Sequence, residues 1–125
     1  MSTSVKSKIL IGLRVLFGLA FVLAAAFKLT GQQQMVAEFA QVGLGQWFRY
    51  LTGVLEVSGA LLLIRPPTVF FGAVLLTHVS IGAFLAQLFV LHGDVIHTVV
   101  FIAAMGWVAY SYRPGRVAAK DLAQV

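Results

Sequence analysis

The amino-acid sequence predicts an all-α integral membrane protein, built as a four-helix bundle with a short interfacial helix between spans one and two. Of its 125 residues, 60% are hydrophobic and only 10% are charged, whereas about a quarter of the residues are charged in soluble domains. The apolar residues gather in four segments, each near the ~20 residues that cross a bilayer as a helix. The basic residues gather at alternate ends of these segments.

The four apolar segments can be placed along the chain by composition. They cover about Ile9–Phe27, Trp47–Ile64, Val69–Leu91 and Val95–Tyr112. Helices are expected because a membrane barrel would need more numerous and shorter alternating strands. We therefore divide the chain into a cytoplasmic N-terminal segment (1–8), a four-helix transmembrane domain (9–112) and a basic cytoplasmic tail (113–125).

The connection between the first two segments is the longest and reads TGQQQMVAEFAQVGLGQ over residues 30–46. Its apolar residues fall on one helical face, with glutamine and glutamate opposite: Met35, Val36, Phe39 and Val42. This pattern predicts a short amphipathic helix lying in the membrane interface, with Trp47 at the headgroup level. A solvated loop is the alternative interpretation.

The positive residues indicate the orientation of the chain. Only Lys28 and Arg49 lie at the outer ends of their segments. The other seven of the nine basic residues share the opposite side: Lys6, Lys8, Arg14, Arg65, Arg113, Arg116 and Lys120. The positive-inside rule predicts a multi-pass protein of the cell (inner) membrane with both termini in the cytoplasm. Because Arg14 interrupts the first apolar segment, we expect a retained span rather than a cleaved signal peptide.

Several kinds of chemistry are excluded by the residue types. With no cysteine, the chain forms no disulfide and no cysteine-ligated iron–sulfur cluster. The net charge of +5 follows the topology rather than a basic patch interleaved with aromatic residues, so nucleic acid is not an expected partner. Neither a self-sufficient catalytic motif nor a metal-ligating pattern is present, and we expect no cofactor held by the chain alone.

Glu56 needs an explanation because it lies near the middle of the second apolar segment. An ionised carboxylate at the centre of a bilayer costs about 2.5–3.5 kcal/mol on the insertion scale, so such a residue is usually paired, protonated or functional. Counting from the turn at residues 65–67 places Glu56 and His78 roughly 12 and 15 Å above the cytoplasmic end of adjacent helices. We therefore expect a hydrogen bond between Glu56 and His78.

The ionisable residues form stripes with small residues between them, which favours faces that point into the bundle. We predict that six of them line a polar pocket that opens outward: Glu56, Lys28, Arg49, His78, His92 and His97. Simpler interpretations stay open for three of the six. Lys28 and Arg49 would reach the headgroups as snorkelling side chains, and His97 would begin a helix at the interface.

Five features follow one another along the chain: Arg14, FKLTG (27–31), EVSGALLLI (56–64), FGAVLL (71–76) and His92. In this order they resemble the DoxX family, in its DoxX-like branch, over about residues 10–112. Ala25 stands where the family often has glycine. The resemblance implies a four-helix membrane protein with cytoplasmic termini, and its motif positions here are Arg14, Lys28, Glu56 and His92. Some members accompany quinone-linked sulfur oxidation or act in membrane-bound redox complexes, and many have no assigned activity.

Three functions are compatible with these features. The first is a membrane subunit of a redox system that binds a quinone-like or small anionic ligand in the outward-facing pocket. A quinone would then be a bound substrate, and electrons would need a redox partner protein, since no cofactor ligands are visible. The others are a structural or assembly subunit without its own ligand, and a small proton-coupled transporter. The lipid bilayer is a partner in each case, and a homo-oligomer is compatible with all three.

The asymmetry of basic residues predicts opposite sides of the membrane for the tail and for the long connection. A reporter fused after Val125 should be active in the cytoplasm, and one inserted within residues 32–41 should be active outside, because the basic ends stay inside. Fusions to alkaline phosphatase and to a fluorescent protein measure the two sides. Reporters that both locate to one side would contradict the four-span topology.

Overall fold

The computed structural model describes residues 2–114, and all regular structure within this range is helical. Five α-helices follow one another: α1 (Thr3–Leu29), α2 (Gln33–Val42), α3 (Gln46–Leu62), α4 (Val69–Ala86) and α5 (Ile96–Ser111). A 3₁₀ turn, η1 (Pro66–Thr68), precedes α4, and a π-helical turn, η2 (Gln87–Leu91), continues it. The predicted all-α class is confirmed. Most of the predicted cytoplasmic tail, from residue 115 onward, lies outside the described range.

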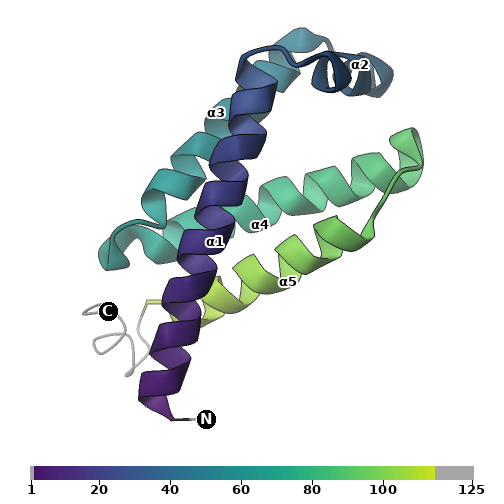
Figure 1. The fold of residues 1–125 in the computed structure, drawn as a ribbon. Helices are drawn as coiled ribbons and strands as arrows, with labels where there is room; N and C mark the ends of the chain where they lie inside the picture. Colours follow the sequence, from purple (N-terminus) through teal and green to yellow (C-terminus); the bar gives the residue numbers. More distant parts are fainter. Residues whose placement is uncertain (1, 115–125) are drawn as a thin grey trace.

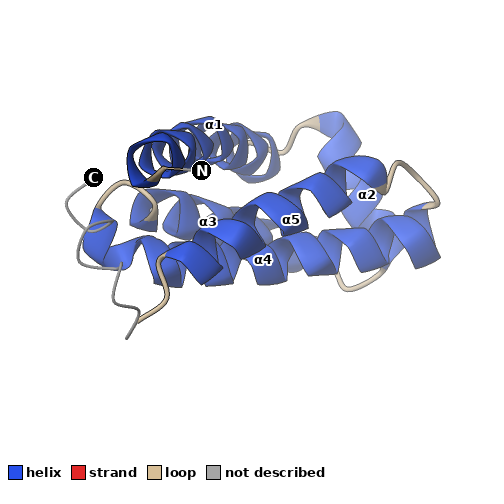
Figure 2. Ribbon diagram, turned by 90° about the horizontal axis from the view of Figure 1, so that it is seen from below, coloured by secondary structure: helices blue, strands red, loops and turns tan. Residues whose placement is uncertain are grey.

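The four longer helices lie alongside one another and the short α2 lies at one end of them (Figure 1). α1 packs against α3, α3 against α4, and α4 against α5, which also contacts α1. The start of α1 and the end of α5 lie together at the opposite end, as Figure 2 also shows. We call this the basic end, because five of the described basic residues lie on α1, in the α3–α4 turn and just beyond α5: Lys6, Lys8, Arg14, Arg65 and Arg113.

Two helical stretches are long and apolar enough to cross a membrane: Thr3–Leu29 and Pro66–Leu91. α5 is apolar as well but shorter. Large apolar side chains on these helices are exposed rather than packed, for example Leu19 on α1 and Phe71 on α4. These features point to a membrane protein. Crossing by four helices stays a prediction.

The ends of the helices follow from local chemistry. α1 begins at Thr3, ahead of the predicted span, because the Ser2 hydroxyl accepts a hydrogen bond from the Val5 amide at 3.2 Å and caps the first turn. α3 ends before Pro66, which lacks the amide needed to continue the helix. α2 ends at Val42, because the following Gly43 adopts a left-handed φ of 84° that closes the helix.

The hydrophobic core fills the half of the molecule nearer the basic end. Phe17 and Phe21 of α1 pack edge-on against Phe101 of α5, with ring centroids 5.0 and 5.1 Å apart. Leu76 of α4 and Met105 of α5 are fully buried in the same cluster. No residue of α2 is buried. The rigid packing thus lies at one end and leaves the other end more open.

Two glycines let α3 and α4 approach closely. A side-chain carbon on Gly72 would lie 2.7 Å from the carbonyl oxygen of Gly59, and one on Gly59 would lie 2.6 Å from the Leu76 side chain. Distances this short do not occur between real Cβ atoms and their neighbours. Small residues at such a crossing are typical of helices that pack in a membrane.

We predict that Gly72→Ala lowers the stability of the protein, because its methyl group would meet main-chain atoms that cannot move aside. A loss of about 1–3 kcal/mol is expected from overpacking of this kind. Thermal unfolding in mild detergent measures the change. Gly106→Ala on α5 is the control, since its methyl group would meet nothing within 4 Å. Equal melting temperatures for both variants would contradict the close crossing.

Candidate functional site

A buried ion pair between Lys28 and Glu56 is the centre of the candidate site. Lys28 lies in the last turn of α1, Glu56 lies on α3, and Nζ is 2.9 Å from Oε1. Their side chains are only 14% and 6% exposed. Pairing offsets part of the cost of removing each charge from water, whereas either charge alone would carry the full cost. Lys28 therefore explains how a glutamate is tolerated inside an apolar segment.

Gly53 allows the end of α1 to come this close to α3. It lies almost one turn before Glu56, and a side-chain carbon there would lie 2.9 Å from the Leu29 side chain and 3.4 Å from Cβ of Lys28. Any larger residue would force the Leu29 side chain to move and would crowd the last turn of α1. The small residue in this stripe thus has a direct role in bringing Lys28 to Glu56.

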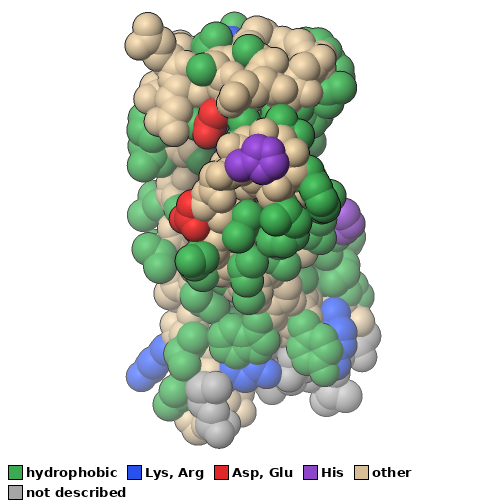
Figure 3. Space-filling view, turned by 90° about the vertical axis from the view of Figure 1, so that its right-hand side faces the viewer, with side chains coloured by type: hydrophobic (Ala, Val, Ile, Leu, Met, Phe, Trp, Pro, Cys, Tyr) green, Lys and Arg blue, Asp and Glu red, His purple; other side chains and the backbone are tan. Residues whose placement is uncertain are grey.

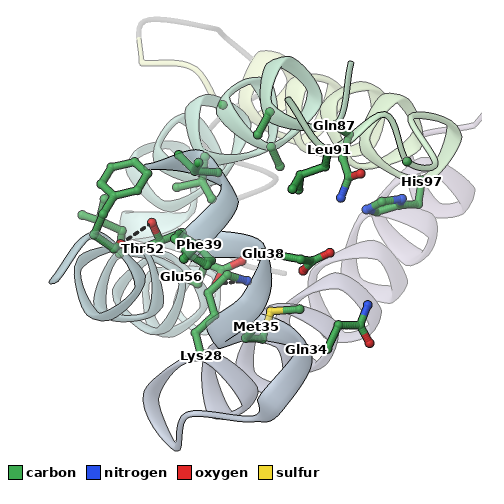
Figure 4. Close-up of a pocket in the computed structure, with 18 of the residues that line it drawn as sticks. Lys28, Gln34, Met35, Glu38, Phe39, Thr52, Glu56, Gln87, Leu91 and His97 are labelled. Carbon is green, nitrogen blue, oxygen red and sulfur yellow. Dashed lines mark hydrogen bonds and ion pairs between the residues drawn. The ribbon is translucent and has the colours of Figure 1, made fainter. Parts of the chain in front are cut away.

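The ion pair lines a cavity of about 790 Å³. The cavity is bordered by the last turn of α1, by α2, α3, α4 with η2, and by the start of α5, and its walls are mainly apolar: Met35, Phe39, Val42, Phe48, Leu55, Leu75, Val79 and Leu91. In Figure 4, Lys28 and Glu56 lie on one side and Gln87 and His97 on the other. In its volume, its apolar walls and its few polar groups, the cavity is typical of a binding site for a small organic molecule.

The short helix predicted between the first two spans is present as α2, and its apolar face covers this cavity. Met35, Phe39 and Val42 line the cavity, and Glu38 projects toward its interior (Figure 4). The same apolar face was expected to lie in the membrane interface. An amphipathic pattern reports only that one face avoids water, and here α3 and η2 provide part of the apolar contact.

Arg49 is buried but is not among the residues that line the cavity. Its Nη1 donates a hydrogen bond to the carbonyl oxygen of Lys28, and its Nε donates to the Gln46 side chain at 2.7 Å. Gln46 in turn donates to the carbonyl oxygen of Val36 in α2 at 3.0 Å. Arg49 thus connects the ends of α1, α2 and α3. It holds together the helices around the cavity without lining the cavity itself.

The three histidines have different positions. His78 is exposed and lines the cavity, and its Nδ1 lies 2.8 Å from the carbonyl oxygen of Val74. The predicted Glu56–His78 hydrogen bond is therefore wrong, and Glu56 pairs with Lys28 instead. His97 lines the cavity 3.4 Å from Asp94 Oδ2, and both side chains are exposed. His92 ends η2 with a left-handed φ of 52° and does not line the cavity.

Several polar residues of the cavity were not in the predicted set, among them Glu38 and Gln87. Glu38 lies on the polar side of the α2 sequence pattern, where solvent was expected. Gln87 begins η2, and a side-chain carbon on Gly93 would collide with its amide oxygen, so the glycine makes room for it. π-helical turns are frequent at functional sites, but no residue pattern announced this one.

The charges of the described chain are segregated. All three acidic residues within 2–114 line the cavity: Glu38, Glu56 and Asp94. On the face in Figure 3, acidic and histidine side chains lie in the upper part, and lysine and arginine lie mainly at the lower end. Lys28 is the one basic lysine or arginine among the lining residues, so the cavity is acidic overall. Within residues 2–114, no three His, Cys, Asp or Glu residues gather to hold a metal ion.

An all-helical chain with two apolar helices of membrane-spanning length and a buried ion pair beside a cavity is typical of a small membrane protein. The sequence model of the DoxX-like family matches residues 12–111, and the chain belongs to this family. The resemblance found in its motifs is thereby confirmed. No curated protein and no solved structure matches the chain.

The ion pair predicts strong coupling between Lys28 and Glu56. Lys28→Met and Glu56→Gln should each lower the free energy of unfolding in mild detergent, by about 3–5 kcal/mol where a buried partner is left unpaired. The double variant should lose clearly less than the sum of the two changes.

The exposed Asp94–His97 pair provides the matched control. Asp94→Asn and His97→Ala should show a coupling energy of about 1 kcal/mol or less, because solvent screens exposed pairs. Additive losses at Lys28 and Glu56 would contradict the ion pair as the link between α1 and α3.

Proposed function

We propose that this is an integral membrane protein in which α1, α3, α4 with η2, and α5 each cross the bilayer as a bundle, with α2 at the outer surface. The two shortest of these helices, α3 and α5, have 17 and 16 residues, near the lower limit of about 17 for a spanning helix. The proposal is supported by the division of side chains on α3, where Arg49 and Glu56 are buried while Val54 and Leu61 are exposed. The basic end would then face the cytoplasm of a cell (inner) membrane.

We further propose that the cavity binds a small uncharged molecule of the quinone type. The observation that carries this proposal is the Lys28–Glu56 pair in an apolar wall. An ammonium group has three donors, and in Lys28 this group forms an ion pair with Glu56 Oε1 at 2.9 Å. A remaining donor of Lys28 would bind a carbonyl oxygen, and the apolar walls would hold the ring. Gln87 and His97 lie on the opposite side, where a second carbonyl would lie.

The acidic lining favours a neutral ligand over the small anion that the sequence also suggested. Glu38 and Asp94 stand beside the same cavity as Glu56, and their negative charges would repel an anion. A carbonyl ligand needs a single donor and no compensating positive charge. The small anion is therefore the weaker form of the proposal.

In a redox role, this chain and a partner protein would have different tasks. The chain would bind and orient the quinone and keep its ring in an apolar environment. Electrons would come from an electron-carrying protein, because such chemistry belongs to cofactors that a protein binds and positions. The protein would thus be the membrane subunit of a larger redox system.

We predict that purified protein in mild detergent binds a short-chain quinone analogue and binds sulfate more weakly. Gly82→Leu should abolish quinone binding, because Gly82 lines the cavity and has open space at its Cβ position that a leucine would fill. Lys28→Gln should weaken it by about 1–3 kcal/mol through loss of a charged donor. Quenching of tryptophan fluorescence or calorimetry measures both.

Gly106→Leu is the control for the leucine substitution, since Gly106 also has open space but lies outside the cavity lining. It should bind the quinone analogue as the unmodified protein does. Unchanged affinity in Gly82→Leu would contradict the cavity as the site. It would favour the structural interpretation, in which the ion pair only holds the bundle together.

A further inference from the structure

A second hollow lies between α1 and α3 at the basic end, away from the cavity. This α1–α3 groove has a volume of about 410 Å³, and all of its lining residues except Arg14 are apolar or glycine. The residues at its rims are each more than half exposed: Val15, Leu19, Leu61 and Ile64. Gly18 lies in the lining between these rims, and a side chain there would begin to fill the groove.

Arg14 is the polar group of this groove and is itself more than nine-tenths buried. Its Nε and Nη2 donate to the carbonyl oxygens of Leu63 and Ile64, each at 2.8 Å, and its Nη1 donates to the Tyr112 hydroxyl at 3.3 Å. A guanidinium has five donors, so these bonds leave two. Among residues 2–114 no carboxylate forms an ion pair with it.

Within residues 2–114, the surroundings of Arg14 add positive charge and no negative charge. Arg65 is exposed and directly follows Ile64, whose carbonyl oxygen Arg14 binds. The acidic residues of the described chain all line the cavity, near the other ends of α1 and α3. The partial negative charge at the carboxyl end of α3 offsets only part of the charge of Arg14. Among the described residues, a counter-charge is therefore missing at this end.

We propose that the α1–α3 groove binds an anionic phospholipid. One acyl chain would lie against the apolar lining around Gly18, and the headgroup phosphate would lie at the end marked by Arg14 and Arg65. Basic pockets between membrane helices bind anionic headgroups, and exposed apolar rims at this position are covered by lipid chains. A free phosphate would match the charge but would leave the apolar groove uncovered, so the occupant is a lipid.

The experiment compares lipids that share acyl chains and differ in headgroup charge. Protein purified in mild detergent and stripped of lipid is titrated with phosphatidylglycerol, with phosphatidylcholine and with inorganic phosphate. Bound lipid is counted by native mass spectrometry, and the melting temperature is recorded in parallel. Phosphatidylglycerol should bind at least about fivefold more tightly than phosphatidylcholine, because a basic residue near an anionic headgroup contributes a factor of this order.

Two variants test the two parts of the site without disturbing the bonds of Arg14. Arg65→Gln should weaken the binding of phosphatidylglycerol roughly fivefold and leave the binding of phosphatidylcholine unchanged. Gly18→Leu should remove the preferential binding by filling the groove. Gly12→Leu is its control on the same helix, because Gly12 has open space and lies outside the groove, and it should bind phosphatidylglycerol normally.

Three outcomes would overturn the proposal. The first is equal affinity for the two phospholipids, which would show that headgroup charge plays no part. The second is unchanged phosphatidylglycerol binding by Gly18→Leu, which would show that the groove is not the binding site. The third is equal stabilisation by inorganic phosphate, which would show that the acyl chain plays no part. None of these results bears on the quinone titration, since the groove and the cavity share no lining residue.

Discussion

The ion pair between Lys28 and Glu56 is the constraint on which the arrangement of the cavity end depends. A carboxylate in an apolar helix needs a partner, and the partner that reaches it sits on the last turn of α1. This fixes the rotation of α1 against α3. The main chain of the same lysine accepts a hydrogen bond from Arg49, whose partner Gln46 binds α2. Lys28, Arg49 and Gln46 thereby connect three helices around the cavity.

The fold class was predictable because its causes are local. Apolar segments of membrane-spanning length and a double proline after α3 define helices and turns without knowledge of the neighbours. The partner of Glu56 was not predictable in this way. Counting residues gives the height of a side chain along a helix but not the direction in which it points. By this count His78 has nearly the same height as Glu56, yet it is exposed and its Nδ1 contacts the main chain of its own helix.

The residues of the cavity also divide into those that the sequence predicted and those that it did not. Glu56, Lys28, His78 and His97 were expected there because ionisable groups within or beside apolar segments are conspicuous. Glu38 was not expected, since a polar residue of a short amphipathic helix usually faces water. Its position depends on where α2 is placed by Gln46 and by the turns at Gly31 and Gly43, both with positive φ. Such placement is a tertiary property that composition does not reveal.

The two ends of the molecule differ in packing as well as in charge. At the basic end, fully buried residues such as Leu10 and Met105 hold α1 and α5 in a continuous core, and Arg14 ties α1 to α3. At the cavity end, α2 has no buried residue. Stability in a folded chain is lowest where few apolar contacts would be lost on opening. The end that carries the cavity is therefore the end that can change shape at least cost, while the core keeps the helices in place.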